Sequence, residues 1–339
     1  MEYRQLGRSG LKVSELCLGT MTFGHGTSES EAALMVDRAV DAGINFFDTA
    51  NSYADAQSEV FLGKALRNRR RDAVVATKFY NPMGAGPNDS GMSRYHIMNA
   101  VEDSLGRLGM DHIDIYYIHH VDQQTPIEEM LRALDDLVRD GKIRYIACSN
   151  YEAWRLMEAL WISQSNGLSR FVCYQPQYNL VVRDIERDLI PACRHAGLGV
   201  VTWGPLAGGF LSGKYQPGER TRPGTRSEAG WAYPKEYFAP NADETLRVLL
   251  DVAAGLDRTP AEIAIRWILE QPVVTSVIVG ARTIEHLENN LRAAGWTLPD
   301  EARERLTEVS APRITYPEAM EWARDASRLS AIRKPGSAS

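Results

Sequence analysis

The sequence predicts an α/β protein built as a (β/α)8 barrel, the TIM-barrel fold. Eight short runs rich in β-branched residues alternate with longer segments of helical periodicity along the 339 residues. This alternation is typical of a parallel sheet whose strands are connected by helices, and eight such units suggest closure into a barrel. The composition, with 44% hydrophobic and 24% charged residues, is ordinary for a globular enzyme and supplies one large core.

Each predicted strand is a short apolar run that ends near a polar, aromatic or glycine residue. Such runs, bounded by turn signals, are typical of buried parallel strands. The eight runs are VSELCLGT ending near Thr20, NFFDTA at Asp48, VVATKF at Lys78, IDIYYIHH at His119, IRYIACSN at Ser149, FVCYQ at Gln175, LGVVTW at Trp203 and VTSVIVG at Gly280.

The helices between these runs carry start and stop signals. In TPIEEMLRALDDLVRDG, Thr125 is the predicted cap, Pro126 suits the first helical position and Glu128 can complete a capping box. Gly141 ends the helix, and the same start recurs as TPAE from Thr259. One apolar stripe faces the barrel, formed by Met130, Leu131, Leu134 and Leu137.

Two long connections rich in Gly and Pro, 81–93 and 203–241, interrupt the regular alternation. Long irregular loops are uncommon in compact domains and are often binding loops. We expect residues 1–339 to form a single domain, with an N-terminal β-hairpin, a barrel core at about 14–293, long βα loops and a C-terminal helical extension over 294–339.

Charge and cysteine usage exclude several classes of protein. A net charge of −6 and a pI near 5.7 argue against a nucleic-acid-binding surface, and the basic run at 67–71 fits a solvated helix end. The four cysteines show no metal-binding spacing and are predicted to be reduced, buried thiols: Cys17, Cys148, Cys173 and Cys193. Without a signal peptide or a spanning apolar run, we expect a cytoplasmic protein that does not enter the membrane.

The polar residues at the predicted strand ends meet at one face, because the active site of such a barrel lies where the strands run into their βα loops. Taken singly, Asp48 also fits a helix cap, Lys78 an exposed strand end and His119 a core histidine. Their joint placement favours a catalytic site. The ordinary pKa of a tyrosine is too high for ready proton exchange at neutral pH, so Tyr53 requires a nearby cation that favours its charged form. Lys78, itself paired with Asp48, is the candidate.

The two adjacent histidines are expected to differ in direction. Side chains alternate across a strand, so we predict that His119 points into the barrel mouth and that His120 points away. A metal site at this pair is therefore not predicted, and the sequence offers no further ligand cluster.

The sequence resembles the aldo-keto reductase superfamily over almost its whole length, from YRQLGRSGLKVSELCLGTMTFG to GARTIEHLENNL. The family carries a catalytic Asp, Tyr, Lys and His on a (β/α)8 barrel. FDTANSY supplies Asp48 and Tyr53, VVATKF supplies Lys78 and IDIYYIHHVD supplies His119. Gly280 and the pair at 203–204 resemble the longer, bacterial-type branch, which is related to potassium-channel β subunits.

The resemblance implies NADPH as the cofactor. No GxGxxG follows a predicted strand, so a Rossmann site is not supported. In the family, the cofactor lies instead along the barrel mouth, with its nicotinamide stacked on Trp203 and its adenosine phosphate on GARTIEHLENNL, where Thr283 is a plausible helix cap. The implied contacts are Gly19, Thr20, Met21, Asp48, Ser149, Asn150, Gln175, Trp203, Gly204, Pro205, Leu206, Ala207, Gly208, Leu211, Lys214, Gly280, Arg282, His286, Asn289 and Asn290.

The leading functional prediction is NADPH-dependent reduction of a small-molecule aldehyde or ketone, with Tyr53 as proton donor. One alternative is an NADP-binding regulatory subunit like the channel β subunits, which often lack the histidine found here at His119. A second is an aldolase that uses Lys78 as a Schiff base. The substrate is not specified, although Phe23, Tyr80, Trp231 and Tyr233 lie on segments that could cover the mouth, and homo-oligomerisation is left open.

Overall fold

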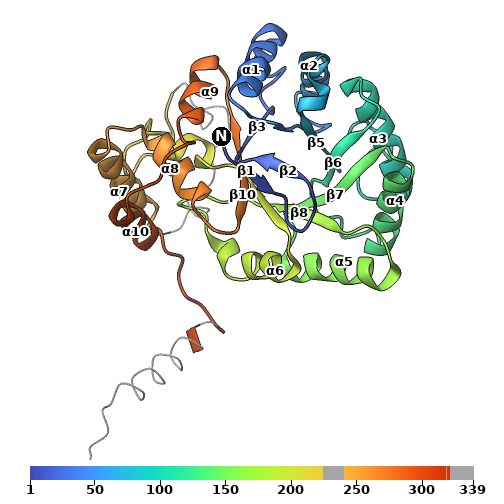
Figure 1. Ribbon diagram of the computed structural model, residues 1–339. Helices are drawn as coiled ribbons and strands as arrows, with labels where there is room; N and C mark the ends of the chain where they lie inside the picture. Colours follow the sequence, from blue (N-terminus) through green and yellow to red (C-terminus); the bar gives the residue numbers. More distant parts are fainter. Residues whose placement is uncertain (224–239, 318, 321–339) are drawn as a thin grey trace, which may run out of the picture.

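The computed structural model describes residues 1–223, 240–317 and 319–320, and within them eight parallel strands close into a barrel (Figure 1). Neighbouring strands pair in chain order, and the last, β10, pairs with the first, β3. The predicted (β/α)8 fold is confirmed. The barrel strands are β3 (Leu16–Gly19), β4 (Phe46–Asp48), β5 (Val74–Phe79), β6 (Ile113–Ile118), β7 (Ile143–Ser149), β8 (Phe171–Gln175), β9 (Gly199–Thr202) and β10 (Val274–Gly280).

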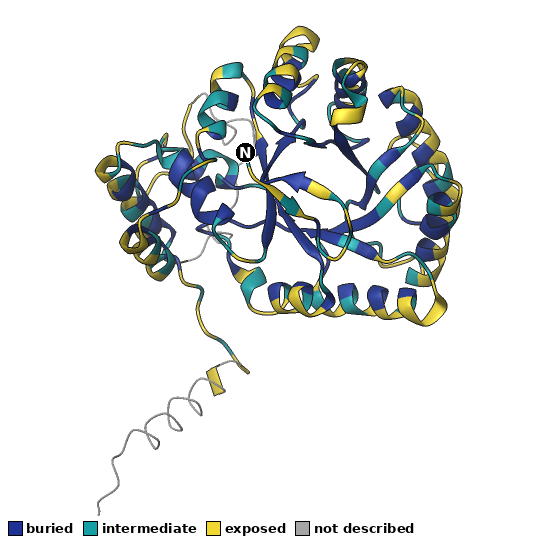
Figure 2. Cartoon of the chain, viewed as in Figure 1, coloured by how far each residue is buried: buried dark blue, intermediate teal, exposed yellow. Residues whose placement is uncertain are grey.

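Helices form the outer layer and turn their polar faces outward (Figure 2). In Figure 2 the barrel strands are mostly dark blue, whereas the outward faces of the helices are yellow. The helices are α1 (Glu29–Asp41), α2 (Gln57–Leu66), α3 (Arg94–Leu108), α4 (Ile127–Arg139), α5 (Ala153–Asn166), α6 (Leu189–Ala196), α7 (Ala242–Gly255), α8 (Pro260–Leu269), α9 (Ile284–Leu291) and α10 (Asp300–Val309), with short 3-10 turns η1 (Arg70–Asp72), η2 (Asp184–Glu186) and η3 (Ala207–Ser212).

Two apolar clusters stabilise this arrangement. Alternate strand residues point inward and fill the barrel, among them Phe46, Ile115 and Val201, while the others pack under the helices. Such interior packing makes the barrel a solid core with no pore, so chemistry is confined to its ends. The predicted stripe of α4 lies in the outer cluster, with all four of its residues buried: Met130, Leu131, Leu134 and Leu137.

An N-terminal hairpin closes the amino-terminal end of the barrel. Strands β1 (Tyr3–Gln5) and β2 (Lys12–Ser14) pair antiparallel, and Leu6 in their loop is buried in the inner cluster. Gly7 has φ +58°, and a Cβ there would lie 2.5 Å from the backbone nitrogen of Gly199, the first residue of β9. The hairpin therefore seats against the strand starts and leaves the opposite end for the site.

Several predicted boundaries were wrong in detail. The run VSELCLGT is divided, because Val13 and Ser14 belong to the hairpin and the barrel strand begins only at Leu16. Thr125 does not cap α4. Its hydroxyl donates instead to Asp122 Oδ2 at 2.7 Å, and the extended residue Pro126 precedes the helix. At α8 the same sequence signal holds, since the Thr259 hydroxyl accepts the Glu262 N–H.

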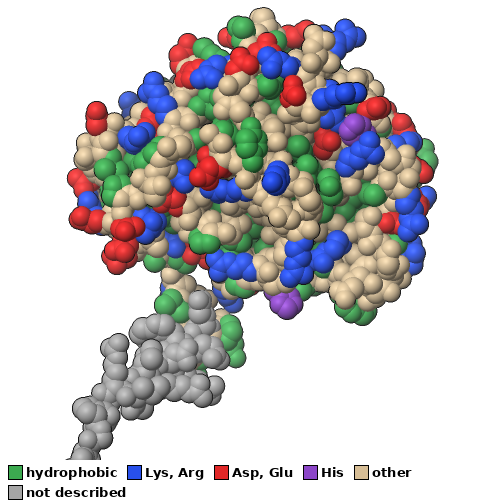
Figure 3. Space-filling model, in the orientation of Figure 1, with side chains coloured by type: hydrophobic (Ala, Val, Ile, Leu, Met, Phe, Trp, Pro, Cys, Tyr) green, Lys and Arg blue, Asp and Glu red, His purple; other side chains and the backbone are tan. Residues whose placement is uncertain are grey.

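The remaining sequence features lie as expected where they are described. The basic run follows the end of α2, and Arg69 and Arg70 form ion pairs with Asp41 and Asp114. All four cysteines are buried and free. Figure 3 shows basic and acidic side chains interspersed over the visible face. Of the segment 203–241, residues 224–239 lie outside the described part, so Trp231 and Tyr233 do as well.

Candidate active site

Four sequence-predicted residues come together at the carboxyl ends of neighbouring strands. Asp48 is the last residue of β4, and Lys78 lies near the end of the adjacent β5. The Lys78 ammonium is buried and donates to Asp48 Oδ1 at 2.5 Å, to the Thr49 carbonyl oxygen at 2.7 Å and to Tyr53 Oη at 3.4 Å. The buried charge thus has both an ionic partner and further hydrogen-bond acceptors, as such a group requires.

His119 completes this group from the end of β6. Its ring lies edge-on to the Tyr53 ring, with the centroids 5.7 Å apart. The backbone carbonyl of His119 accepts a hydrogen bond from Asn150 Nδ2 at 3.0 Å, which ties the histidine to the loop after β7. The tyrosine hydroxyl, the ammonium and the imidazole therefore border one region of the barrel mouth.

The prediction that His120 points away from His119 was wrong. The two rings stack with centroids 4.6 Å apart and only 11° between their planes, and Tyr80 lies edge-on to the second ring at 5.5 Å. The reason is that β6 ends at Ile118, so strand alternation does not extend to the histidine pair. Both imidazoles thus lie on the same side of the chain. Within the described residues, no group of three or more His, Cys, Asp or Glu side chains could hold a metal ion.

Burial sets the protonation states of the site. It raises the pKa of Tyr53 above its ordinary value; Lys78 opposes this effect and Asp48 adds to it. From the sequence we expected the ammonium to bring the pKa of the phenol toward neutrality. The low-dielectric surroundings outweigh that effect, so the pKa rises instead. Burial would lower the pKa of Lys78, but Asp48 and Tyr53 raise it above its ordinary value. Burial, with Lys78 and His120, lowers the pKa of His119 to about 2.

The backbone around the site is strained. Ala54, Asp55 and Ala56 follow Tyr53 with φ of +50°, +50° and +70°, three consecutive residues in the left-handed region. Tyr80, two residues after Lys78, has φ +145°. Non-glycine residues in such conformations cost of order 1–3 kcal/mol each and cluster at functional sites. The observed strain is therefore a further sign that this mouth is a site.

The residues expected around a nicotinamide carboxamide are hydrogen-bonded to one another. Gln175 Nε2 donates to Asp48 Oδ2 at 2.9 Å, and the Ser149 hydroxyl donates to the Gln175 carbonyl at 2.7 Å. Trp203 Nε1 donates to Asn150 Oδ1 at 3.3 Å. The structure thus brings this set together, but it also gives Gln175 a task that the sequence did not suggest, which is to hold the second carboxylate oxygen of Asp48.

The segment after Trp203 has a backbone suited to close approach by a ligand. Gly204, Ala207, Gly208 and Gly209 all have positive φ, between +48° and +105°. A Cβ at Gly209 would meet nothing within 4 Å, so that part of the turn borders open space. The other predicted contacts here are mostly buried and anchor the turn to the core: Pro205, Leu206, Ala207 and Leu211.

Basic side chains lie at the other end of the predicted cofactor path. Burial, Lys214 and Arg282 lower the pKa of His286, while Glu285 opposes them, so the charges of Lys214 and Arg282 both act on this histidine. Lys214 and Arg282 are both exposed. The predicted cap of α9 is present, since Thr283 accepts the His286 N–H. This donor set matches the chemistry of a phosphate.

Six other predicted contacts have mixed outcomes. Asn290 is buried and donates to the Gly280 carbonyl at 3.1 Å, so its amide joins α9 to β10, while Asn289 is half-buried. The Thr20 hydroxyl donates to the Asp48 carbonyl at 3.1 Å. A Cβ on Gly280 would meet nothing within 4 Å, which leaves the end of β10 open. Gly19 ends β3, and Met21 beside it is half-buried.

Sequence reasoning missed Asn81. Its Nδ2 donates to Ser52 Oγ at 3.0 Å and lies 3.5 Å from His119 Nδ1. The residue follows Lys78 by three positions and lies two residues beyond the end of β5, and that position was the available signal. Asn51 was also missed; it is buried and its amide has no hydrogen-bond partner among the described residues.

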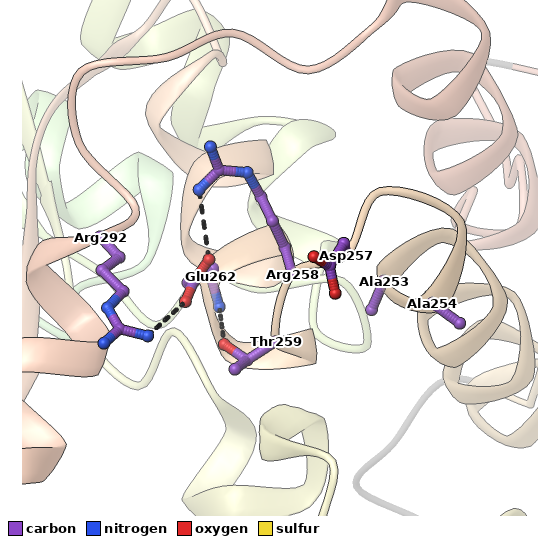
Figure 4. A pocket seen from close by; sticks show the side chains of 7 residues that line it. All are labelled: Ala253, Ala254, Asp257, Arg258, Thr259, Glu262 and Arg292. Atoms are coloured by element: carbon purple, nitrogen blue, oxygen red, sulfur yellow. Dashed lines mark hydrogen bonds and ion pairs between the residues drawn. The ribbon is translucent and has the colours of Figure 1, made fainter.

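A separate cleft of about 490 Å³ lies in the helical shell between α7, α8 and the end of α9 (Figure 4). Figure 4 shows Arg258 and Arg292 converging on the carboxylate of Glu262. With Asp257, the lining carries two acidic and two basic side chains, and none of the strand-end residues lines the cleft. We therefore assign the chemistry to the barrel mouth.

A closed barrel with a buried lysine–aspartate pair and a tyrosine hydroxyl at the carboxyl ends of its strands defines the class of barrel oxidoreductases that act on carbonyl groups. The chain belongs to the aldo/keto reductase family, whose model matches residues 15–311. Within the described residues, no helix has the length and apolar character needed to cross a membrane.

Similar proteins include both enzymes and channel-associated subunits. An uncharacterised oxidoreductase of Bacillus subtilis (strain 168) is 40% identical over 95% of this chain and 100% of its own length. A probable voltage-gated potassium channel subunit beta of Oryza sativa subsp. japonica is 38% identical over 86% of this chain and 91% of its own. The versiconal hemiacetal acetate reductase of Aspergillus parasiticus is 33% identical over 94% and 99%.

Proposed function

We propose that the protein is an NADPH-dependent reductase of small-molecule aldehydes or ketones, with Asp48, Tyr53, Lys78 and His119 as its catalytic residues. The observation that carries this proposal is the buried Lys78 ammonium, 2.5 Å from Asp48 Oδ1 and 3.4 Å from Tyr53 Oη. A phenol held beside a buried cation can release its proton to a nearby oxygen, because the cation stabilises the phenolate that remains.

In this proposal each residue has a distinct task. Tyr53 holds its proton at neutral pH, since its pKa is raised, and donates it to the carbonyl oxygen of the substrate. Lys78 stabilises the resulting phenolate, and Asp48 keeps the ammonium charged and in place. His119 is neutral, so it acts as a hydrogen-bond donor to the same oxygen and orients the substrate.

The residues at the mouth fit a nicotinamide dinucleotide. Trp203 offers an indole face, Lys214 and Arg282 offer two cations for a phosphate, and His286, whose pKa is lowered by burial and by Lys214, offers a neutral imidazole. When bound, the reduced nicotinamide supplies the hydride that the carbonyl carbon receives. The same arrangement supports alcohol oxidation in reverse, with Tyr53 taking up the proton.

The test of the proton donor is Tyr53→Phe, which removes only the hydroxyl. We expect turnover of a panel of aldehydes, ketones and sugar phosphates, followed by NADPH absorbance, to fall about 100- to 10,000-fold. NADPH affinity should stay within about twofold, because the hydroxyl acts in the transition state. Tyr95→Phe, on an exposed tyrosine of α3, is the matched control. Turnover within a few-fold of the parent would refute the assignment, and an adduct trapped on Lys78 by borohydride would favour the aldolase alternative.

NADPH preference is tested at Arg282, whose planar guanidinium suits the ribose phosphate that NADH lacks. Arg282→Ala should remove charge-assisted hydrogen bonds of roughly 1.5–3 kcal/mol, so NADPH affinity falls about 10- to 100-fold while NADH affinity changes little. Fluorescence titration of both cofactors measures this, with Arg71→Ala as a control at an exposed arginine of the basic run. Equal weakening of both cofactors would assign Arg282 to the pyrophosphate or to the fold.

The second candidate function is that of a regulatory NADP-binding subunit, since the relative in Oryza sativa is named a probable voltage-gated potassium channel subunit beta. A regulatory NADP-binding subunit would hold the cofactor tightly and turn over carbonyl substrates poorly. The presence of His119 beside Tyr53 favours the enzyme. Tight NADPH binding without measurable reduction of any carbonyl in the panel would favour the regulatory alternative.

A further inference from the structure

Asn81 lies between two elements of the candidate site. Its Nδ2 donates to Ser52 Oγ at 3.0 Å, and Ser52 immediately precedes Tyr53. The same nitrogen lies 3.5 Å from His119 Nδ1, so one amide group faces both the tyrosine loop and the imidazole. Asn81 takes no part in the roles that we propose for Asp48 and Lys78.

The contact with Asn81 bears on which nitrogen of His119 carries the proton, because the role of an imidazole nitrogen in a hydrogen bond depends on the tautomer. An amide NH2 group has two protons and no free lone pair, so it can only donate. The facing Nδ1 of His119 must then accept. The imidazole is neutral, because burial, Lys78 and His120 lower its pKa to about 2, and a neutral ring carries a single N–H. That proton is therefore on Nε2.

We propose that Asn81 is a positioning residue that fixes His119 in the Nε2–H tautomer, which allows the histidine to donate to the substrate oxygen. This inference rests on the proposed function, since it concerns the same carbonyl reduction. A donor aimed in advance at the oxygen where negative charge develops lowers the barrier, whereas a bare nitrogen at that place repels it. Asn81 thus acts through His119 and does not touch the substrate.

The other contacts of His119 do not determine its tautomer, so we assign this role to Asn81. The ring is stacked on His120 and lies edge-on to Tyr53, and neither contact distinguishes the two nitrogens. Asn150 binds the backbone carbonyl of the histidine and not its ring. Among the described residues, the hydrogen-bond partner of the His119 imidazole is the amide of Asn81. The hydrogen bond made by one ring nitrogen of a histidine commonly sets which nitrogen carries the proton.

The experiment replaces Asn81 by an isosteric group of opposite hydrogen-bonding character. In Asn81→Asp, the carboxylate can only accept, so Nδ1 takes the proton and Nε2 loses it. Nitrogen-15 NMR of histidine-labelled protein at pH 8 reads the tautomer directly, because protonated and bare imidazole nitrogens resonate far apart. His119→Gln serves to assign the signals. We expect Nε2–H in the parent and Nδ1–H in Asn81→Asp.

Activity provides the second measurement. With a carbonyl substrate from the panel, kcat of Asn81→Asp should fall about 100- to 1,000-fold, the usual cost of one lost donor at a developing oxyanion. NADPH affinity should be unchanged. Asn166→Asp, which adds the same charge at an exposed site on α5, is the matched control. In a His119→Gln background, Asn81→Asp should have little further effect, because the two residues act as one unit.

The two measurements separate this inference from the proposed function. If the parent reduces no carbonyl, the proposed function fails, while the NMR result still decides the tautomer. Nδ1–H in the parent, or Nε2–H retained in Asn81→Asp, would overturn the inference. So would an equal fall in kcat in the parent and His119→Gln backgrounds, since Asn81 would then act through the fold.

Discussion

The protonation of Tyr53 is set more by its burial than by its charged neighbours. Lys78 lowers its pKa, but burial and Asp48 raise it, and the net value lies above that of an ordinary tyrosine. The phenol is therefore protonated throughout the neutral range. In the proposed reaction, such a phenol carries its proton at neutral pH, and the ammonium beside it stabilises the phenolate that would form.

This balance predicts the pH dependence in both directions. Reduction needs the protonated phenol, so kcat/KM for the carbonyl should be flat from about pH 6 to 9 and fall only as pH rises through the elevated pKa, above about 10. Alcohol oxidation needs the phenolate and should rise roughly tenfold per pH unit over the same range. His119 adds no ionisation there, because its pKa is about 2. Steady-state rates in overlapping buffers measure both profiles.

A bell-shaped reduction profile with a limb near neutrality would contradict this prediction. It would mean that Tyr53 or His119 titrates in that range, and that other interactions cancel the effect of burial on its pKa. The control is NADPH affinity, measured by fluorescence without substrate. It should not change across the same pH range, because the proposed role of Tyr53 lies in proton transfer and not in cofactor binding.

Sequence alone predicted the residues whose position follows from strand order, but not those whose role depends on side-chain geometry. Asp48 and Lys78 end adjacent strands, so their proximity follows from the alternation of strands and helices. The bond from Gln175 to Asp48 crosses the mouth between residues 127 positions apart, and no local pattern specifies it. The stacking of His120 was missed because periodicity does not show that β6 ends at Ile118.

The turn that carries Tyr53 is held in a costly conformation by the elements on either side of it. Three left-handed residues connect the tyrosine to α2, and the N–H of Gln57 closes the turn on the Ala54 carbonyl at 3.0 Å. An L-residue in this region costs roughly 1–2 kcal/mol, whereas glycine adopts it freely. The turn places Tyr53 against Lys78 at the expense of local stability.

Ala54→Gly should therefore stabilise the protein. Glycine removes the left-handed penalty but gains freedom in the unfolded chain, so we expect a net increase of roughly 0.5–1 kcal/mol in the free energy of unfolding. The urea midpoint should rise with an unchanged slope. The matched control is Ala65→Gly within α2, which should destabilise by about 1 kcal/mol because its conformation is helical. If both substitutions destabilise the protein, the contacts of the Ala54 methyl contribute more stability than its left-handed conformation costs.

The two ends of the barrel have different tasks. The hairpin of β1 and β2 seals the strand starts, and the catalytic candidates occupy the strand ends. Even the short strand β9 separates these ends by roughly 10 Å or more. Sites at such a distance that share no partner usually contribute additively to stability. Stability and activity should then be separable by mutation.

Leu6→Ala tests this separation. The Leu6 side chain is fully buried inside the barrel, so its removal should lower the free energy of unfolding by about 2–5 kcal/mol. kcat/KM of the folded enzyme should stay within about twofold of the parent, since the lost contacts lie at the closed end. Leu34→Ala, on a leucine of α1 that is 64% exposed, should change stability by less than about 0.5 kcal/mol.

Cofactor binding supplies the deciding comparison between the two ends. NADPH at a hundred times its dissociation constant should stabilise the parent by about 2.7 kcal/mol, because it binds only the folded state. The same increment should appear in Leu6→Ala, measured as the shift of the urea midpoint at constant slope. A smaller increment, together with weaker NADPH affinity, would mean that the hairpin shapes the mouth through the barrel core. An equal increment would show that the fold can lose stability at its closed end without altering the site at its open end.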